Sequence, residues 1–178
     1  VTKFIYFLYI KLLLMNPTHI HLMLNHFPII GTLMGSAIIL FGIVKKQNSS
    51  RAIGAFIIVI MAVIAIPVML TGEPAEESIK HLNGISKPLI HDHEEAAEKA
   101  FWMMEITGTF SLIALILYRI KPALASKAFW IAFSFSVITF FTMVWAGNLG
   151  GKIRHPETSN TFINVDKNAT GSQPQNDK

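Results

Sequence analysis

The chain has 178 residues, of which 52% are hydrophobic and only 15% charged, a composition too apolar for an ordinary soluble domain of this size. It has no cysteine, which excludes disulfides, thiolate metal sites, cysteine-held iron–sulfur clusters and haem attached through a C-x-x-C-H motif. The net charge of +4 comes from short basic clusters beside apolar runs, which is not the basic face of a nucleic-acid-binding protein. The expected partner is the lipid bilayer.

Residues 1–15, "VTKFIYFLYIKLLLM", are apolar but too short to cross a bilayer, and Lys3 and Lys11 interrupt them. Two interpretations stay open. The segment is either a signal-like or interfacial leader, or sequence upstream of a true start at Met15. We favour the second, because an uncharged beginning "MNPTHIH" suits an amino terminus that lies outside the cell.

Four apolar runs are long enough to cross a membrane, at residues 22–44, 52–70, 100–118 and 128–146. None alternates as a barrel strand does, so we expect an all-α, four-helix transmembrane bundle within residues 16–156. Two of the connections are short and basic. They carry Lys45, Lys46 and Arg51, and Arg119, Lys121 and Lys127. The positive-inside rule puts these connections in the cytoplasm, and the 71–99 connection and both termini outside it.

The 71–99 connection has helix signals of its own. Thr71-Gly72 is expected to end the second span, and a short helical cap over residues 74–82 would end at Asn83-Gly84. Ser86 is expected to cap a helix that continues without a break into the third span, from residue 87 to 118. The polar segment 157–178 has little apolar content and is expected to be disordered.

Helical spacing sorts the third span into two faces. The first is polar and holds His91, Glu94, Glu95, Glu98, Trp102, Glu105 and Thr109. The second has small residues and holds His93, Ala97, Ala100, Met104, Gly108 and Ser111. A small-residue face admits another helix or a flat cofactor.

In the first span, His19 and His26 share one face, opposite Pro28, Gly31 and Gly35. Counted from the cytoplasmic ends, His19 is level with His93, and His26 lies about 10 Å deeper than His93. Glu105 falls inside the apolar layer, where a carboxyl group is costly and needs a partner in the bundle. It is either a hydrogen-bonded glutamic acid with a structural role or a functional group.

Four segments together resemble a family of bacterial four-span membrane proteins known as a domain of unknown function, in the form found in Bacteroidetes-type bacteria. They are "NHFPIIGT", "TGEPAEE", "HEEAA" and "GNLGGKIRHPE", and the resemblance covers residues 16–157. It implies a helical bundle of the bacterial cytoplasmic (inner) membrane with no assigned activity. The positions that match the family are His26, Glu76, Glu77, His93, Glu94, Glu95 and His155. The chain is also loosely similar, in fold only, to two-haem cytochrome b bundles.

Three functions stay open. The first is an extracytoplasmic metal site, because imidazole with carboxylate suits zinc, iron, manganese or copper(II). Its predicted ligands are His26, Glu77, His93, Glu94 and His155. The second is b-type haem and electron transfer, with His93 and either His26 or His19 as axial ligands.

The third is an accessory or structural membrane subunit without a cofactor. An enzyme is the less favoured interpretation, because the sequence has no G-x-S-x-G motif, P-loop or dinucleotide fingerprint. Association as a homo-oligomer or with a partner membrane subunit also stays open.

Overall fold

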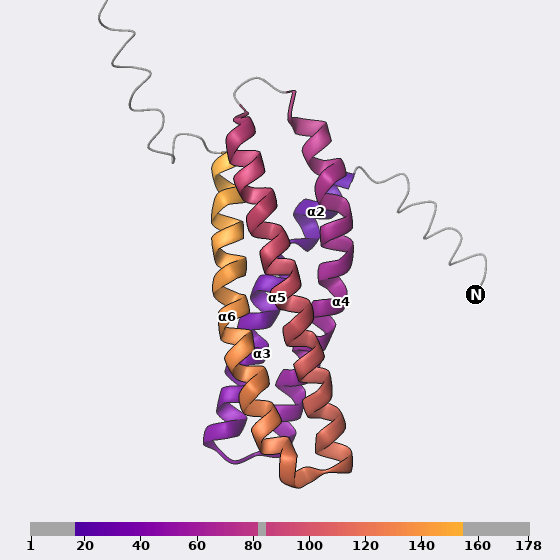
Figure 1. Ribbon diagram of the computed structural model, residues 1–178, viewed down its shortest axis with the longest axis vertical. Coiled ribbons are helices and arrows are strands. Elements are labelled where there is room, and N and C mark those ends of the chain that lie inside the picture. Colours follow the sequence, from indigo (N-terminus) through magenta and orange to yellow (C-terminus); the bar gives the residue numbers. More distant parts are fainter. Residues whose placement is uncertain (1–16, 82–84, 155–178) are drawn as a thin grey trace, which may run out of the picture.

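The computed structural model describes residues 17–81 and 85–154, which form helices joined by short connections (Figure 1). The helices are α2 (Pro17–Leu24), α3 (His26–Val44), α4 (Asn48–Ile79), α5 (Lys87–Ile120) and α6 (Pro122–Arg154). The predicted all-α class is confirmed for this part of the chain. The leader at 1–15, the tail at 157–178 and His155 lie outside the described residues.

Within residues 17–81 and 85–154, four helical stretches are long and apolar enough to cross a membrane, and each contains one predicted span. They are Thr18–Val44, Asn48–Ile79, Lys87–Ile120 and Pro122–Ile153. The predicted number of helices that could cross a membrane is therefore confirmed for the described residues. Each helix continues past the apolar run that predicted it, so the bundle is taller than a bilayer core alone requires.

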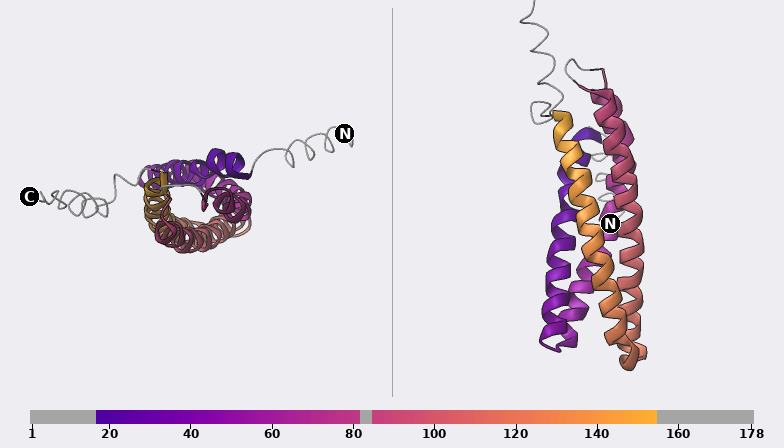
Figure 2. Two further views of the ribbon diagram at one scale, coloured as in Figure 1. Left: turned by 90° about the horizontal axis from the view of Figure 1, so that it is seen from above. Right: turned by 60° about the vertical axis from the view of Figure 1, so that its left-hand side comes forward.

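The four long helices form an up-and-down bundle in which sequence neighbours pack side by side and α6 closes the ring against α3 (Figure 2). The connections at 45–47 and 121 lie together at one end, which we call the basic end (Figure 1). The outer turns of α4 and α5 lie at the opposite end and hold the acids from Glu73 to Glu98; we call it the acidic end.

The first span is interrupted near Pro28. Proline has no backbone N–H, so the carbonyl of Leu24, one turn earlier, loses its helical partner. Helix α2 packs on α4, whereas α3 packs on both α4 and α6. The Thr18 and Ser78 hydroxyls lie 2.6 Å apart and join α2 to the outer part of α4. Because of this break, the two parts of the span pack against different neighbours.

Small residues let α3 and α4 approach closely. A Cβ atom added at Gly54 would lie 2.6 Å from the Gly35 carbonyl oxygen and 2.8 Å from the Ile39 nitrogen. Gly31 faces Met61 just as closely. Gly31 and Gly35 therefore serve close contact between the two helices.

Paired hydroxyl groups fill the middle of the bundle. Ser36 donates to Ser136 at 2.7 Å, and Thr107 and Thr139 lie 2.7 Å apart, with all four side chains buried. These bonds join α6 to α3 and to α5. In a membrane core each satisfied hydroxyl stabilises helix association, because an unpaired one is costly there.

At the basic end a buried arginine joins three helices. Arg51 is only 7% exposed, and its guanidinium donates to the Gly42 and Ile43 carbonyls at 3.0 and 3.4 Å. It also donates to Asn48 and to the Ser126 hydroxyl. A cation on the last carbonyls of α3, which backbone N–H groups of the following connection also reach, opposes the negative end of the helix dipole.

The predicted helical cap is wrong. Helix α4 does not end at Thr71-Gly72 but runs without interruption through Pro74 to Ile79. Losing the N–H of Pro74 costs one backbone bond, and the Thr18–Ser78 contact and the burial of Ala75 oppose a break there. The predicted stop at Asn83-Gly84 lies outside the described residues. The predicted start after Ser86 is confirmed, with Pro88 in the first turn of α5.

Candidate functional site

Two histidines face the bundle interior near the acidic end. His21 comes from α2 and His93 from α5, and both side chains are half-buried. His93 is close enough to act electrostatically on the His21 imidazole. Among the described histidines, these are the two whose side chains are not exposed.

The register of the helices puts these histidines at the same level. Helices α3 and α5 run in the same direction, from the acidic end to the basic end. The Thr32 hydroxyl bonds to Met104 Sδ at 3.4 Å, so level positions on these two helices differ by 72 residues. The same offset leads from His21 to His93.

Both imidazoles are fixed through the same ring atom. Nδ1 of His21 lies 3.0 Å from the Val68 carbonyl oxygen on α4, and Nδ1 of His93 lies 2.9 Å from the Ala146 carbonyl oxygen on α6. A carbonyl only accepts, so each Nδ1 carries the proton and each Nε2 keeps its lone pair. Within the described residues no hydrogen bond occupies either Nε2.

This arrangement suits a metal ligand. Ligating histidines nearly always donate the other ring N–H to a carboxylate or backbone carbonyl, which fixes the tautomer and raises the basicity of the ligating nitrogen. His21 and His93 both have this support, from different helices. The pair can present two neutral nitrogen donors near the acidic end.

A glycine lies beside each of the two imidazole rings. A Cβ atom at Gly150 would lie 2.9 Å from His93 Cε1 and 3.2 Å from its Nδ1, so this ring requires glycine there. At Gly72 a Cβ atom would lie 3.7 Å from His21 Cε1, an ordinary contact. Along α5, Ala97 and Ala100 follow His93 on its own face, so the surroundings are small and largely uncharged.

The other two predicted haem ligands point elsewhere. His19 and His26 are both exposed, on the side of the first span opposite its buried glycines. The prediction of His19 or His26 as the partner of His93 does not agree with this geometry. The physical reason is that residues seven apart share a face, and the buried face holds positions 21, 28, 35 and 42 rather than 19 and 26.

The predicted metal ligands do not converge. Four of them are described. His26, Glu77 and Glu94 are exposed, and only His93 turns inward. Glu77 is paired with Lys80, and its carboxylate, by accepting a hydrogen bond, raises the pKa of that lysine. Among the described residues no three histidine, aspartate or glutamate side chains lie close enough to hold one metal ion.

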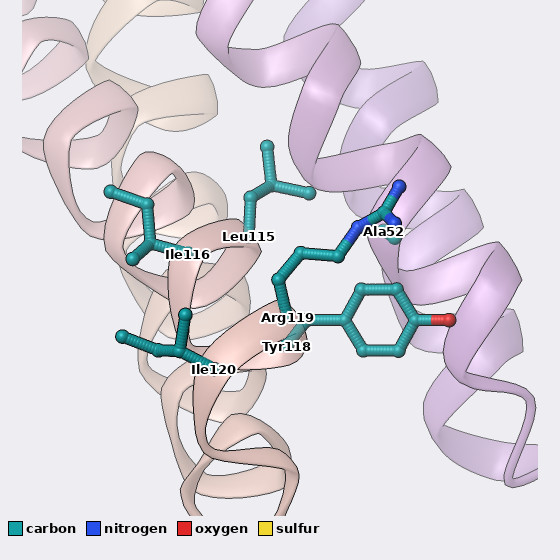
Figure 3. A pocket seen from close by; sticks show the side chains of 6 residues that line it. All are labelled: Ala52, Leu115, Ile116, Tyr118, Arg119 and Ile120. Atoms are coloured by element: carbon teal, nitrogen blue, oxygen red, sulfur yellow. The ribbon is translucent and has the colours of Figure 1, made fainter.

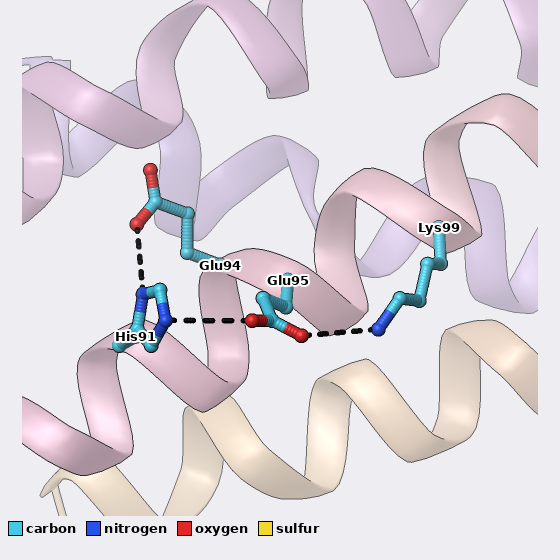
Figure 4. A network of polar contacts seen from close by, with 4 residues as sticks. All are labelled: His91, Glu94, Glu95 and Lys99. Carbon is cyan, nitrogen blue, oxygen red and sulfur yellow. Dashed lines mark hydrogen bonds and ion pairs between the residues drawn. The ribbon is translucent and has the colours of Figure 1, made fainter.

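The conspicuous "HDHEE" segment forms a surface network on α5 (Figure 4). His91 lies 3.4 Å from Glu95 and 4.0 Å from Glu94, and Lys99 lies 3.1 Å from Glu95. These side chains are more than half exposed, so the pairs are solvent-screened and contribute little to stability. Glu76 and Glu94 line a shallow groove nearby, between α4 and α5.

Glu105 is half-buried, and its Oε1 atom has no hydrogen-bond partner among the described residues. No hydrogen bond joins it to His26 or Trp102, the nearest polar candidates by helical spacing, within the described residues. A carboxyl group without a partner in this setting is costly.

Sequence reasoning missed His21, although a signal was present. His21 precedes Pro28 by seven residues, and Pro28 precedes Gly35 by seven, so His21 continues the small-residue face of the first span. Comparison of the chain with protein-family models, curated proteins and solved structures found no match. The functional argument therefore rests on the geometry of this pair.

Proposed function

We propose that this protein is an integral membrane protein that binds b-type haem through His21 and His93 and transfers electrons. The observation that carries the proposal is the level pair of imidazoles, each fixed by Nδ1 to a backbone carbonyl and each with an unbonded Nε2. Axial ligation needs two such nitrogens, whereas a zinc-type site needs three or four protein ligands, which the described residues do not assemble.

The residues around the pair fit this group in their chemistry. Neutral imidazole is the usual axial ligand of b-type haem, and the glycine and alanine residues beside the rings are the small residues against which a flat macrocycle can pack. Haem, when bound, supplies reversible one-electron iron chemistry. The protein's own part is to orient both rings, to keep each Nδ1 protonated and to surround the pair with apolar helices.

The proposal includes an orientation. The basic end would lie in the cytoplasm and the acidic end, with the histidine pair, on the outer side of a bacterial cytoplasmic membrane. All six cations of the basic end support this under the positive-inside rule. Membership of the bacterial four-span family, based on the "NHFPIIGT" and "TGEPAEE" segments, is part of the same proposal.

The test compares haem content among histidine variants produced in haem-replete cells. His21→Ala and His93→Ala should each lose most of the bound haem, because each removes one of two axial nitrogens. His26→Ala and His19→Ala are the matched controls and should retain it, since both side chains are exposed. Added imidazole should restore part of the haem spectrum to the His21→Ala and His93→Ala proteins if they are folded.

Two results would contradict the proposal. The first is full haem content in His21→Ala and His93→Ala with loss in His26→Ala. The second is an unaltered protein that purifies without haem, which would favour the cofactor-free accessory subunit.

A further inference from the structure

A shallow groove lies at the basic end, far along the bundle from the histidine pair. It is formed between α4 and α5 and has a volume of about 390 Å³. Its lining residues are Ala52, Leu115, Ile116, Tyr118, Arg119 and Ile120. Figure 3 shows the Arg119 side chain extending across the groove toward α4, where Ala52 lies. The groove thus combines apolar walls with one guanidinium group.

Arg119 has no counter-charge among the described residues. No hydrogen bond or ion pair joins it to another described residue. The sequence has no aspartate or glutamate before Glu73, and none between Glu105 and Glu157, so the whole basic end is free of acids. Six cations lie there. Of these six, only Arg51 is buried, and its guanidinium is hydrogen-bonded within the bundle.

The apolar walls of the groove indicate that the ligand has an apolar part in addition to its anionic group. Ile116 and Ile120 are 49% and 65% exposed and lie on the outer side of the bundle, where a bilayer would cover them. Tyr118 has an apolar ring and a polar hydroxyl, as is common where a helix leaves the hydrocarbon. A free anion would contact Arg119 but not these apolar walls, whereas a lipid would contact both.

We infer that this groove binds an anionic phospholipid, with the headgroup phosphate on Arg119 and an acyl chain along Leu115, Ile116 and Ile120. Guanidinium matches phosphate in geometry and forms two parallel hydrogen bonds with it. Basic pockets between membrane helices recur as headgroup sites for anionic lipids. The inference is independent of the histidine pair and needs only the bundle and its charge distribution.

The test uses the full chain in mild detergent, with phosphatidylglycerol and phosphatidylcholine as probes and native mass spectrometry to count bound lipids. Phosphatidylglycerol should bind more tightly than phosphatidylcholine. Arg119→Gln should weaken phosphatidylglycerol binding roughly fivefold, the effect of one basic residue on an anionic lipid. Lys121→Gln is the matched control, because it removes the same charge two residues away without lining the groove.

Glycerol phosphate carries the headgroup phosphate without acyl chains, so it distinguishes a site for a free anion from a site for a lipid. It should not compete with phosphatidylglycerol at lipid concentrations that saturate the site. Thermal unfolding of each variant without lipid shows that the bundle is intact. The inference fails if Lys121→Gln weakens binding as much as Arg119→Gln, which would indicate unspecific attraction. It also fails if the two phospholipids bind equally, or if glycerol phosphate competes as a free anion would.

Discussion

The position of the His93 ring depends on a missing side chain in the facing helix. Gly150 lies one turn beyond Ala146, whose carbonyl accepts the His93 Nδ1 proton, so the ring is held between a bond and a close surface. The residue that decides how this histidine presents Nε2 is therefore a glycine on α6.

Gly150→Ala should lower haem affinity about tenfold without unfolding the bundle. The added methyl group would displace His93 and cost its carbonyl bond, roughly 1–1.5 kcal/mol. The measurement is haem titration of the apoprotein followed by absorbance. Gly151→Ala is the control, because a Cβ atom there meets nothing within 4 Å of the described structure and gains the same helix propensity. Equal affinities of the two variants would show that Gly150 does not position the ring.

At this scale the sequence predicted one histidine of the pair and not the other. His93 was identifiable because α5 is one regular helix, so its face could be counted from residue 87 onward. The partner was missed because a count of depth from the basic end gave His19, two residues from the level that the Thr32–Met104 contact shows. A small error in axial register is enough to select the wrong face of a helix.

Among the elements, the crossing of α3 and α4 has the least tolerance for added volume. At Gly54 a methyl group would meet the Gly35 carbonyl oxygen and the Ile39 backbone nitrogen, and backbone atoms cannot move aside as a flexible side chain can. The two helices would have to separate along the crossing. The hydrogen bonds from Arg51 to the carbonyls at the end of α3 would then be disturbed as well.

Gly54→Ala should destabilise the protein by about 1–3 kcal/mol, the usual cost of overpacking a close contact. Thermal unfolding in detergent, followed by circular dichroism, measures the difference. Gly147→Ala provides the comparison, since its nearest described neighbour is the end of the Ile29 side chain at 3.4 Å. A Gly54→Ala protein as stable as Gly147→Ala would rule out this tight crossing.

The sequence predicted the helices well and one of their ends poorly. Long apolar runs define spans because the bilayer requires them, and all four were found. Thr71, Gly72 and Pro74 are strong local signals for a helix end, yet α4 continues through them. Local signals were overridden by contacts with α2 (Thr18 with Ser78, and His21 with Val68), which no local pattern contains.

Over the whole molecule, charge is sorted along the bundle axis. Acids occupy the end formed by the outer turns of α4 and α5, and six cations without an acid among them occupy the described end with the two short connections. The sorting was readable from sequence because the apolar runs separate the charged segments. The sequence did not show which side chains converge across the bundle, because convergence depends on the rotation and register of the helices.

Single cysteines test the orientation, since the natural chain has none. Asp92→Cys, at the exposed acidic end, should react with a membrane-impermeant thiol reagent in intact spheroplasts. Ser49→Cys, exposed at the basic end, should react only after the membrane is permeabilised. The reverse pattern would place the basic end outside the cell.

The histidine pair is the central claim, and an absorption spectrum tests it most directly. The unaltered protein, purified in mild detergent without a chelator from haem-replete cells, is measured oxidised and then reduced with dithionite. The account predicts a reducible b-type haem spectrum at one haem per chain. A visible spectrum that is flat in both states would contradict it.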